Sequence, residues 1–217
     1  MSIKNNILRI KSQVAAINPQ AKIMAVTKNQ PLDNIMTVIN AGINIIGENK
    51  WQEFEKKFIE TQYIASVQDN EKAQFHFIGT LQTNKVKYIV KYFDCIQSVN
   101  SLRLAKKIDS ECKKINKIIS VMIEINISHD QNKSGIMPED LNSLIKEIMK
   151  LKNIKLIGLM TITAQEDKQK TRTDFKVMKK LFDQYNFTEL SMGMSNDYQI
   201  ALEEGATMVR IGRILFC

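Results

Sequence analysis

Short apolar runs alternate along the chain with longer amphipathic stretches. The runs are rich in Ile, Val, Phe and Met, whereas apolar residues in the longer stretches recur at helical spacing. This alternation predicts strands separated by helices, and therefore a parallel sheet. Eight strands are expected, at Lys22–Thr27, Asn44–Gly47, Gln74–Gly79, Cys95–Val99, Ile118–Ile127, Ile154–Ile162, Glu189–Gly193 and Met208–Gly212.

The amphipathic stretches predict a crossover helix after each of the first seven strands. These helices are expected at Leu32–Asn40, Lys50–Val67, Asn84–Lys91, Ser101–Ile115, Pro138–Lys150, Glu166–Tyr185 and Asp197–Glu204. A further helix, Ile3–Ile17, precedes the first strand and would cover the gap where an eighth crossover would lie.

This element count favours one α/β architecture, the single (β/α)₈ or TIM barrel with an extra N-terminal helix. A doubly wound open sheet is the alternative, but it usually has about five or six strands and a glycine-rich first turn. Here the turn after the first run, TKNQP, contains no glycine. No flexible linker and no block of like charges interrupts the pattern, so we expect residues 1–217 to form one domain.

The composition excludes several classes of protein. Hydrophobic residues make up 44% and charged residues 25%, as in ordinary globular domains. Three cysteines without CxxC spacing and two histidines argue against a disulfide framework and against a zinc site, so no metal is expected. No apolar run is long enough to span a bilayer and the N-terminus is too polar for a signal peptide, so we expect a cytoplasmic protein without membrane contact.

The chain is basic, with 31 Lys and Arg against 23 Asp and Glu. A charge of +8 raises the possibility of nucleic-acid binding. However, only five of the basic residues are Arg, the residue that groove readers and phosphate clamps favour. Most of the lysines have the spacing of solvated helix faces, so we expect no nucleic-acid partner and keep such binding only as a distant alternative.

Candidate chemistry lies where the predicted strands end, because active sites of TIM barrels lie at the C-terminal ends of the strands. Lys28 directly follows the apolar run IMAVT, which would put its amine at the barrel mouth. A partly desolvated lysine there is nucleophilic towards an aldehyde. The plain alternative is an ordinary solvated lysine.

A second signal is a potential phosphate site after strands seven and eight, where barrels often bind phosphate. Ser195 is positioned to cap the helix Asp197–Glu204, two glycines allow the backbone to approach an anion, and two arginines add charge. The residues that could form this site are Gly193, Ser195, Arg210, Gly212 and Arg213. The alternative is an ordinary helix cap and turn.

Together, a strand-end lysine and a phosphate site indicate a phosphorylated aldehyde that is held covalently, and pyridoxal 5′-phosphate (PLP) is the common cofactor of that description. A Schiff-base aldolase or another phosphosugar-binding barrel is the competing interpretation. The lysine of such aldolases normally comes from a later strand with acids nearby.

Six sequence blocks resemble those of the pyridoxal phosphate homeostasis proteins, the YggS/PROSC family. The resemblance extends from about Met24 to Phe216, and its blocks are AVTKNQP, IIGENKWQEF, FHFIGTLQTNK, EINISHDQNKSGI, LIGLMTITA and LSMGMSNDYQIALEEGATMVRIGRILF. It implies a monomeric or weakly associating barrel similar to the N-terminal domain of alanine racemase, with PLP bound to Lys28 as a Schiff base.

The resemblance also implies further site residues. Phosphate ligands would be Ser195, the backbone at Gly212 and Arg213, and Met194. Arg210 would face the pyridine nitrogen or the phosphate, and Asn49 and Met160 would line the cofactor. Lys133 and Lys85 lie in blocks typical of the family and would receive or release cofactor, with plain solvated lysines as the alternative. His76, between aromatic residues of a predicted strand, is expected to be a core histidine. Arg213 departs from the family pattern, in which Ser or Thr is common at that position.

The residues favour a carrier over an enzyme. A racemase needs a base on each face of its substrate, and Lys28 is the one clear base at a predicted strand end. The barrel accounts for the whole sequence, and an arginine near the pyridine nitrogen would weaken carbanion stabilisation. We therefore expect a protein that buffers PLP and delivers it, with apo PLP-dependent enzymes as partners. A slow PLP-dependent amino-acid racemase, with Lys28 as its catalytic residue, remains the alternative.

Overall fold

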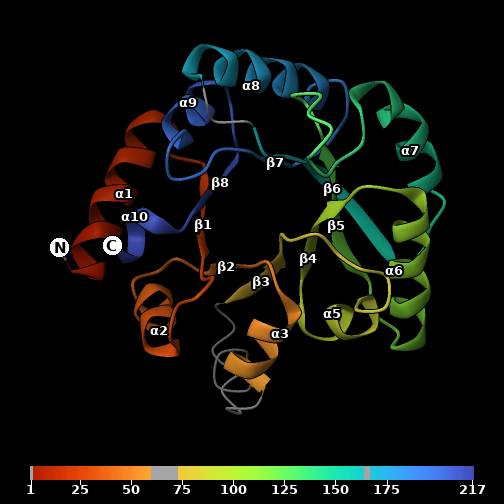
Figure 1. Cartoon of the computed structure of the whole chain (residues 1–217), viewed down its shortest axis with the longest axis horizontal. Helices are drawn as coiled ribbons and strands as arrows, with labels where there is room; N and C mark the ends of the chain where they lie inside the picture. Colours follow the sequence, from red (N-terminus) through yellow and green to blue (C-terminus); the bar gives the residue numbers. More distant parts are fainter. Residues whose placement is uncertain (1, 60–72, 164–166) are drawn as a thin grey trace.

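The strands close into a parallel barrel in chain order, from β1 to β8, in a computed structural model that describes residues 2–59, 73–163 and 167–217. Figure 1 looks along this barrel, with the helices arranged around it. The predicted TIM barrel is therefore confirmed. The strands are β1 (Lys22–Val26), β2 (Ile45–Glu48), β3 (Gln74–Phe77), β4 (Cys95–Val99), β5 (Ile119–Ile125), β6 (Ile154–Thr161), β7 (Glu189–Ser191) and β8 (Met208–Ile211).

The helices follow the predicted order, with some differences at their ends. They are α1 (Ile3–Ile17), α2 (Leu32–Asn40), α3 (Trp51–Phe54), α5 (Val86–Tyr92), α6 (Leu102–Lys114), α7 (Leu141–Ile148), α8 (Lys168–Phe182), α9 (Tyr198–Glu203) and α10 (Arg213–Phe216). A 3₁₀ turn, Pro138–Asp140, leads into α7. The short helix α10 was not predicted.

The predicted helix Lys50–Val67 has a different form. Its first turn is α3, and the chain continues as the π-helix η1 (Glu55–Ile59). The rest of this prediction lies outside the described residues. A π-helical turn is uncommon and occurs frequently near functional sites.

Side chains alternate along the strands between the layer under the helices and the inside of the barrel. Side chains that point outward pack against the helices in one large apolar cluster, in which the Phe54 ring contacts Phe75 edge to face and Phe93 at a tilt. Side chains that point into the barrel are more polar, and a small apolar cluster of Cys95, Met122 and Met160 lies among them. The barrel interior therefore carries polar groups that must find partners there.

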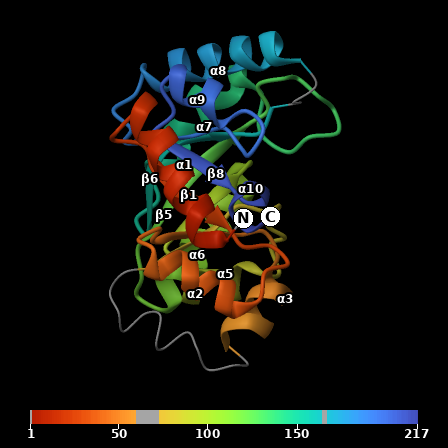
Figure 2. The same cartoon turned by 90° about the vertical axis from the view of Figure 1, so that its left-hand side faces the viewer.

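The two ends of the described chain lie side by side, as Figures 1 and 2 show. Strand β1 pairs with β8 and closes the barrel, with Met24 opposite Arg210. Helix α1 packs against α10, and the Asn6 side-chain amide donates to the carbonyls of Leu215 and Cys217. The segment after β8 is thus fixed against the N-terminal helix.

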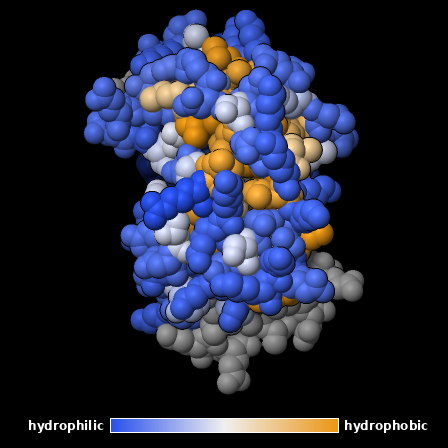
Figure 3. All heavy atoms as spheres, turned by 90° about the vertical axis from the view of Figure 1, so that its right-hand side faces the viewer, coloured by the Kyte–Doolittle hydropathy of each residue, from blue (hydrophilic) through white to orange (hydrophobic). Residues whose placement is uncertain are grey.

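The surface is mainly hydrophilic on the side of α6 and α7, with hydrophobic atoms in the middle of the view in Figure 3. Exposed large apolar residues include Ile115, Ile118 and Met149, which lie in the turns after α6 and α7. No helix among the described residues is both long and apolar enough to cross a membrane.

Candidate functional site

Two adjoining cavities open at the C-terminal ends of the strands, which we call the mouth of the barrel. The rim cavity, of about 510 Å³, is lined by Lys28 after β1, by Ser195 after β7 and by Gly212 and Arg213 after β8. The central cavity, of about 570 Å³, contains Glu124 of β5 and residues that follow β2, β3, β5 and β6. Val26, Met194 and Arg210 line both cavities, so the two spaces are neighbours.

Lys28 is exposed and lines the rim cavity, as the predicted strand end requires. It is the second residue of a turn in which the Gln30 amide donates to the Thr27 carbonyl at 3.0 Å. Asn29 follows with φ of 59°, in the left-handed region that Asn tolerates better than most residues. The amine therefore comes from a defined turn.

The loop between β7 and α9 brings Met194 and Ser195 to the rim cavity, but Ser195 is not the predicted helix cap. Helix α9 begins at Tyr198, and Asp197 is its N-cap residue. The Asp197 carboxylate accepts hydrogen bonds from the Met194 amide and the Thr163 hydroxyl, which folds the loop back on itself. Ser195 is consequently half-buried on the cavity wall, where its hydroxyl is available to an anion.

The other wall of the rim cavity is the start of α10. Gly212 is the N-cap residue of this helix. A Cβ atom at Gly212 would lie 3.3 Å from the Val26 carbonyl oxygen, so a side chain would crowd the junction of β8 and β1. Arg213 follows, and its exposed side chain lines the cavity. This departure from the family pattern therefore keeps a positive charge at the rim.

Arg210 is buried in the barrel and is the cation shared by both cavities. Its guanidinium donates to the Ser191 hydroxyl and to the Thr161 carbonyl, each at 2.7 Å. Burial lowers the pKa of Arg210 to about 10, and the charges of Asp197 and Glu124 oppose this shift. The side chain thus stays charged at neutral pH.

A chain of neutral groups supports Arg210 from below. The Ser191 hydroxyl donates to Gln97 at 2.8 Å, and the Gln97 amide nitrogen lies 2.9 Å from His76 Nδ1. His76 is 4% exposed, which confirms the predicted core histidine. Burial lowers its pKa to about 4, so it is uncharged at neutral pH. The groups below the Arg210 cation are therefore uncharged and do not repel it.

The central cavity contains two acceptor oxygens that have no partner among the described residues. They are Glu124 Oε2 and Asn49 Oδ1, both buried. Burial also raises the pKa of Glu124, although the Ser134 hydroxyl and the charge of Arg210 oppose the shift. An unpartnered buried acceptor is costly and indicates a place for a ligand that donates hydrogen bonds.

Glu124 was missed in the sequence. It lies in the run IISVMIEINI, where it is the one charged residue, and strand alternation from Met122 turns it into the barrel. A charge inside an otherwise apolar strand was the signal that could have identified it.

The remaining predicted residues divide between the cavities and the core. Asn49 and Lys133 line the central cavity. Lys85 lines a smaller neighbouring pocket of about 320 Å³. Met160 is fully buried against Cys95 and Met122 below the mouth, and Ile162 lies on the cavity wall two residues further on.

These residues fit a phosphorylated aromatic aldehyde. The rim cavity offers an amine after β1 and, after β7 and β8, a hydroxyl, a helix start and a cation for a phosphate. The central cavity offers unpartnered acceptors for the polar groups of a ring. In the described ranges no cluster of His, Cys, Asp or Glu could hold a metal ion.

The chain is similar to a set of proteins with one common name. Residues 1–217 match the family described as alanine racemase, N-terminal domain. The pyridoxal phosphate homeostasis protein of Aquifex aeolicus is 39% identical over 203 residues, covering 90% of this chain and 86% of that protein. The protein of the same name from Pasteurella multocida is 36% identical over 231 residues, covering 100% and 97%.

The chain is also similar over its full length to solved structures of PipY. The structure of PipY from Synechococcus elongatus without PLP has a TM-score of 0.89 and 31% identity, and covers 100% of both chains. The structure of PipY with PLP bound has a TM-score of 0.84 and 29% identity, again over 100% of both chains.

Proposed function

The chain belongs to the pyridoxal phosphate homeostasis family of alanine racemase N-terminal domains, and from this we propose that it binds PLP through Lys28 and buffers and delivers the cofactor. One observation carries the proposal: Lys28, Ser195, Gly212 and Arg213 come from three separate places in the sequence and line one cavity with Arg210. A PLP-bound relative of the same fold supports it.

Each residue has a stated part in this proposal. The aldehyde of PLP condenses reversibly with a primary amine, and the Lys28 amine serves that purpose. Ser195, the backbone at Gly212 and Arg213, and the charge of Arg213 bind the phosphate, with Met194 beside them. Arg210 holds a fixed positive charge at the PLP ring. Asn49 accepts a hydrogen bond from a polar group of that ring. A cation there disfavours protonation of the pyridine nitrogen.

The first test is the absorbance spectrum of the purified protein with and without added PLP. We expect a yellow species in the wild type that is absent in Lys28→Ala, and borohydride reduction should fix the cofactor to the peptide that contains Lys28. Lys50→Ala is the matched control, because Lys50 also lies at the mouth but lines the central cavity. A colourless wild type, or label on another lysine, would contradict the proposal.

The racemase alternative now has an observation in its favour. The central cavity contains the Glu124 carboxyl, a second group able to accept a proton, in addition to Lys28. Exchange of the α-proton of an amino acid with solvent deuterium, lost in Glu124→Gln, would support an enzyme. Lack of exchange in the PLP-loaded wild type would leave the carrier function.

The finer parts of the proposal concern the cell. We place the protein in the cytoplasm, as a monomer, with apo PLP-dependent enzymes as recipients and without a nucleic-acid partner. Lys133 and Lys85 are the candidates for cofactor exchange because each lines a pocket at the mouth. Transfer of PLP to an apo-enzyme in the presence of an excess of a competing free amine would test direct delivery.

A further inference from the structure

Both peptide groups that flank Lys28 are held by charged side chains from one helical segment. The carbonyl of Thr27, which precedes Lys28, accepts a hydrogen bond from Lys57 Nζ at 2.7 Å. The amide of Asn29, which follows Lys28, donates to Glu53 Oε2 at 3.1 Å. The backbone on each side of the proposed PLP lysine is therefore fixed from outside the barrel.

These two side chains come from α3 and from the π-helix η1 that continues it. Glu53 and Lys57 are four residues apart, and their charged groups lie 3.7 Å from each other. This segment leaves the mouth directly after β2, and α3 packs against β2. The segment thus brings an ion pair to the turn that follows β1 and contains Lys28.

Glu48 at the end of β2 completes the arrangement. Its Oε1 accepts from the Thr27 hydroxyl at 2.6 Å and from Lys57 at 3.0 Å. The Glu48 side chain is fully buried and that of Lys57 is 14% exposed. Burial raises the pKa of Glu48, and Lys57 and Thr27 oppose the shift. Lys57 is therefore the cation that keeps a buried carboxylate compensated.

Two neighbouring side chains connect this outer cluster with the mouth. Thr27 is fully buried with its side chain towards Glu48, whereas the next side chain, Lys28, is exposed. Lys28 lines the rim cavity. Its direction depends on the two flanking peptide planes, and the left-handed Asn29 needs support to persist.

We propose that Lys57 and Glu53 are positioning residues that fix the two peptide groups flanking Lys28 and so direct its amine into the rim cavity. The inference rests on the proposed function only for the role of the amine. Neither residue lines the rim cavity or the central cavity, and each acts through the backbone of the Lys28 turn.

The main test is Lys57→Met, with two ligands. The equilibrium constant for the lysine adduct with PLP should fall about tenfold or more, the size expected for hydrogen bonds to charged groups. Affinity for pyridoxine 5′-phosphate, which carries an alcohol in place of the aldehyde, should stay within about twofold, because phosphate binding uses other residues. Lys56→Met is the matched control, since Lys56 is the exposed neighbour.

A second variant and a second readout keep the proposal falsifiable if Lys57→Met does not fold. Glu53→Gln retains an acceptor but loses the charge, so adduct formation should fall about threefold. In the cofactor-free protein, hydrogen exchange of the Asn29 amide should accelerate about tenfold in either variant, because its charged partner is lost or released.

Each outcome decides one question. Adduct formation and Asn29 exchange at wild-type values would overturn the proposal. An equal fall in affinity for both ligands would also overturn it, because that result means general loss of the cavity. If the wild type forms no adduct, the proposed function fails, and faster Asn29 exchange in the variants would still support the positioning of the turn.

Discussion

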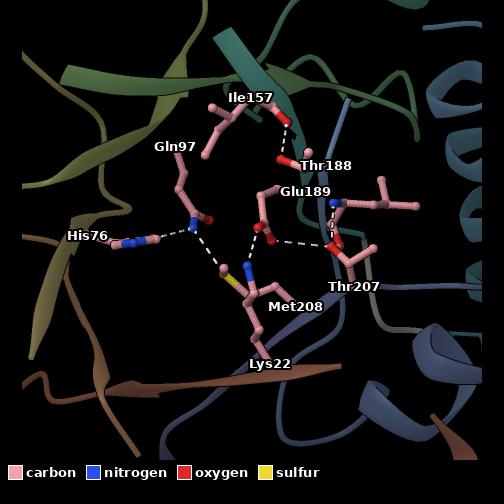
Figure 4. Close-up of polar contacts among 9 residues, drawn as sticks. Lys22, His76, Gln97, Ile157, Thr188, Glu189, Thr207 and Met208 are labelled. Carbon is pink, nitrogen blue, oxygen red and sulfur yellow. Dashed lines mark hydrogen bonds and ion pairs between the residues drawn. The ribbon is translucent and has the colours of Figure 1, made fainter. Parts of the chain in front are cut away.

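Two glutamates at opposite ends of the barrel interior have the same burial and different surroundings. Glu189 and Glu124 are both 6% exposed. At the N-terminal ends of the strands, which form the floor, Glu189 pairs with Lys22 and accepts from the Thr207 hydroxyl, as Figure 4 shows. At the mouth, Glu124 Oε2 has no partner among the described residues.

The polar groups at the floor serve stability, and those at the mouth are open to a ligand. At the floor, polar groups are paired with one another: Gln97 contacts both His76 and Met208, and Thr188 bonds to the Ile157 carbonyl (Figure 4). At the mouth, the corresponding groups face cavities. In TIM barrels the C-terminal face carries the site and the N-terminal face carries stability, and here this division is visible in individual hydrogen bonds.

Acid should lower the free energy of unfolding through His76, which belongs to the hydrogen-bonded chain of Ser191, Gln97 and His76 between the mouth and the floor. This is the largest effect we expect. The pKa of His76 is about 4 in the folded protein, below its ordinary 6.5. Its contribution to stability is therefore complete above pH 6.5 and falls by about 3 kcal/mol as the pH drops through 4. Urea unfolding of the wild type between pH 7 and 4 measures this loss, and His76→Gln should remove it.

The other histidine provides the control for this prediction. His129 is exposed and has φ of 53°, which Asn tolerates. His129→Asn should keep the wild-type pH dependence. A wild-type slope that survives in His76→Gln would mean that another group responds to acid.

Variants at the two ends should differ sharply in cofactor binding. Ser195→Ala combined with Arg213→Ala removes a hydroxyl and a charge from the rim cavity and should weaken PLP binding about 30-fold, or about 2 kcal/mol. Lys22→Met at the floor should leave the affinity within about twofold. Spectroscopic titration measures both, and equal losses would abolish the distinction between mouth and floor.

The two glutamates should respond to the same substitution with opposite sign, by about 1 kcal/mol each. Burial raises the pKa of Glu124 above 4.5, so stability falls as the pH rises from 4.5 through the folded value. Glu124→Gln should therefore raise Tm by about 2–4 °C at neutral pH and leave it unchanged at pH 4.

Glu189→Gln is the comparison for this last prediction. It loses the ion pair with Lys22, whose side chain is half exposed, and should lower Tm by about 2–4 °C at neutral pH. Thermal unfolding followed by circular dichroism suits both variants. A lower Tm in Glu124→Gln would mean that this carboxyl is satisfied in the cofactor-free protein.

The architecture could be predicted because strand and helix periodicity are local properties of the sequence. The predicted run Cys95–Val99 is β4 without change, and Ile3–Ile17 is α1. Errors lie at the ends: the run Glu189–Gly193 gave a strand that stops at Ser191, because Gly193 has φ of 90° and turns the chain towards α9. The π-helix had no local signal.

The residues of the candidate site that directly follow strands could be predicted. It could not be predicted which residue along a strand reaches the cavity wall. Lys28, Ser195 and Gly212 follow strands and line the rim cavity. Met160 and Ile162 are both on β6 or directly after it, and which of them reaches a cavity wall depends on the stagger of neighbouring strands. That stagger arises from long-range pairing, which periodicity does not contain.

The order of the elements along the chain has a consequence for biosynthesis. The rim cavity joins Lys28, which is synthesised directly after β1, with residues of β8 and α10, which are synthesised much later. Strand β8 must reach β1 and α10 must meet α1 before this wall exists. A nascent chain whose β8 and α10 are still in the ribosomal tunnel therefore lacks the phosphate side of its site, and cofactor binding there must wait until these elements emerge.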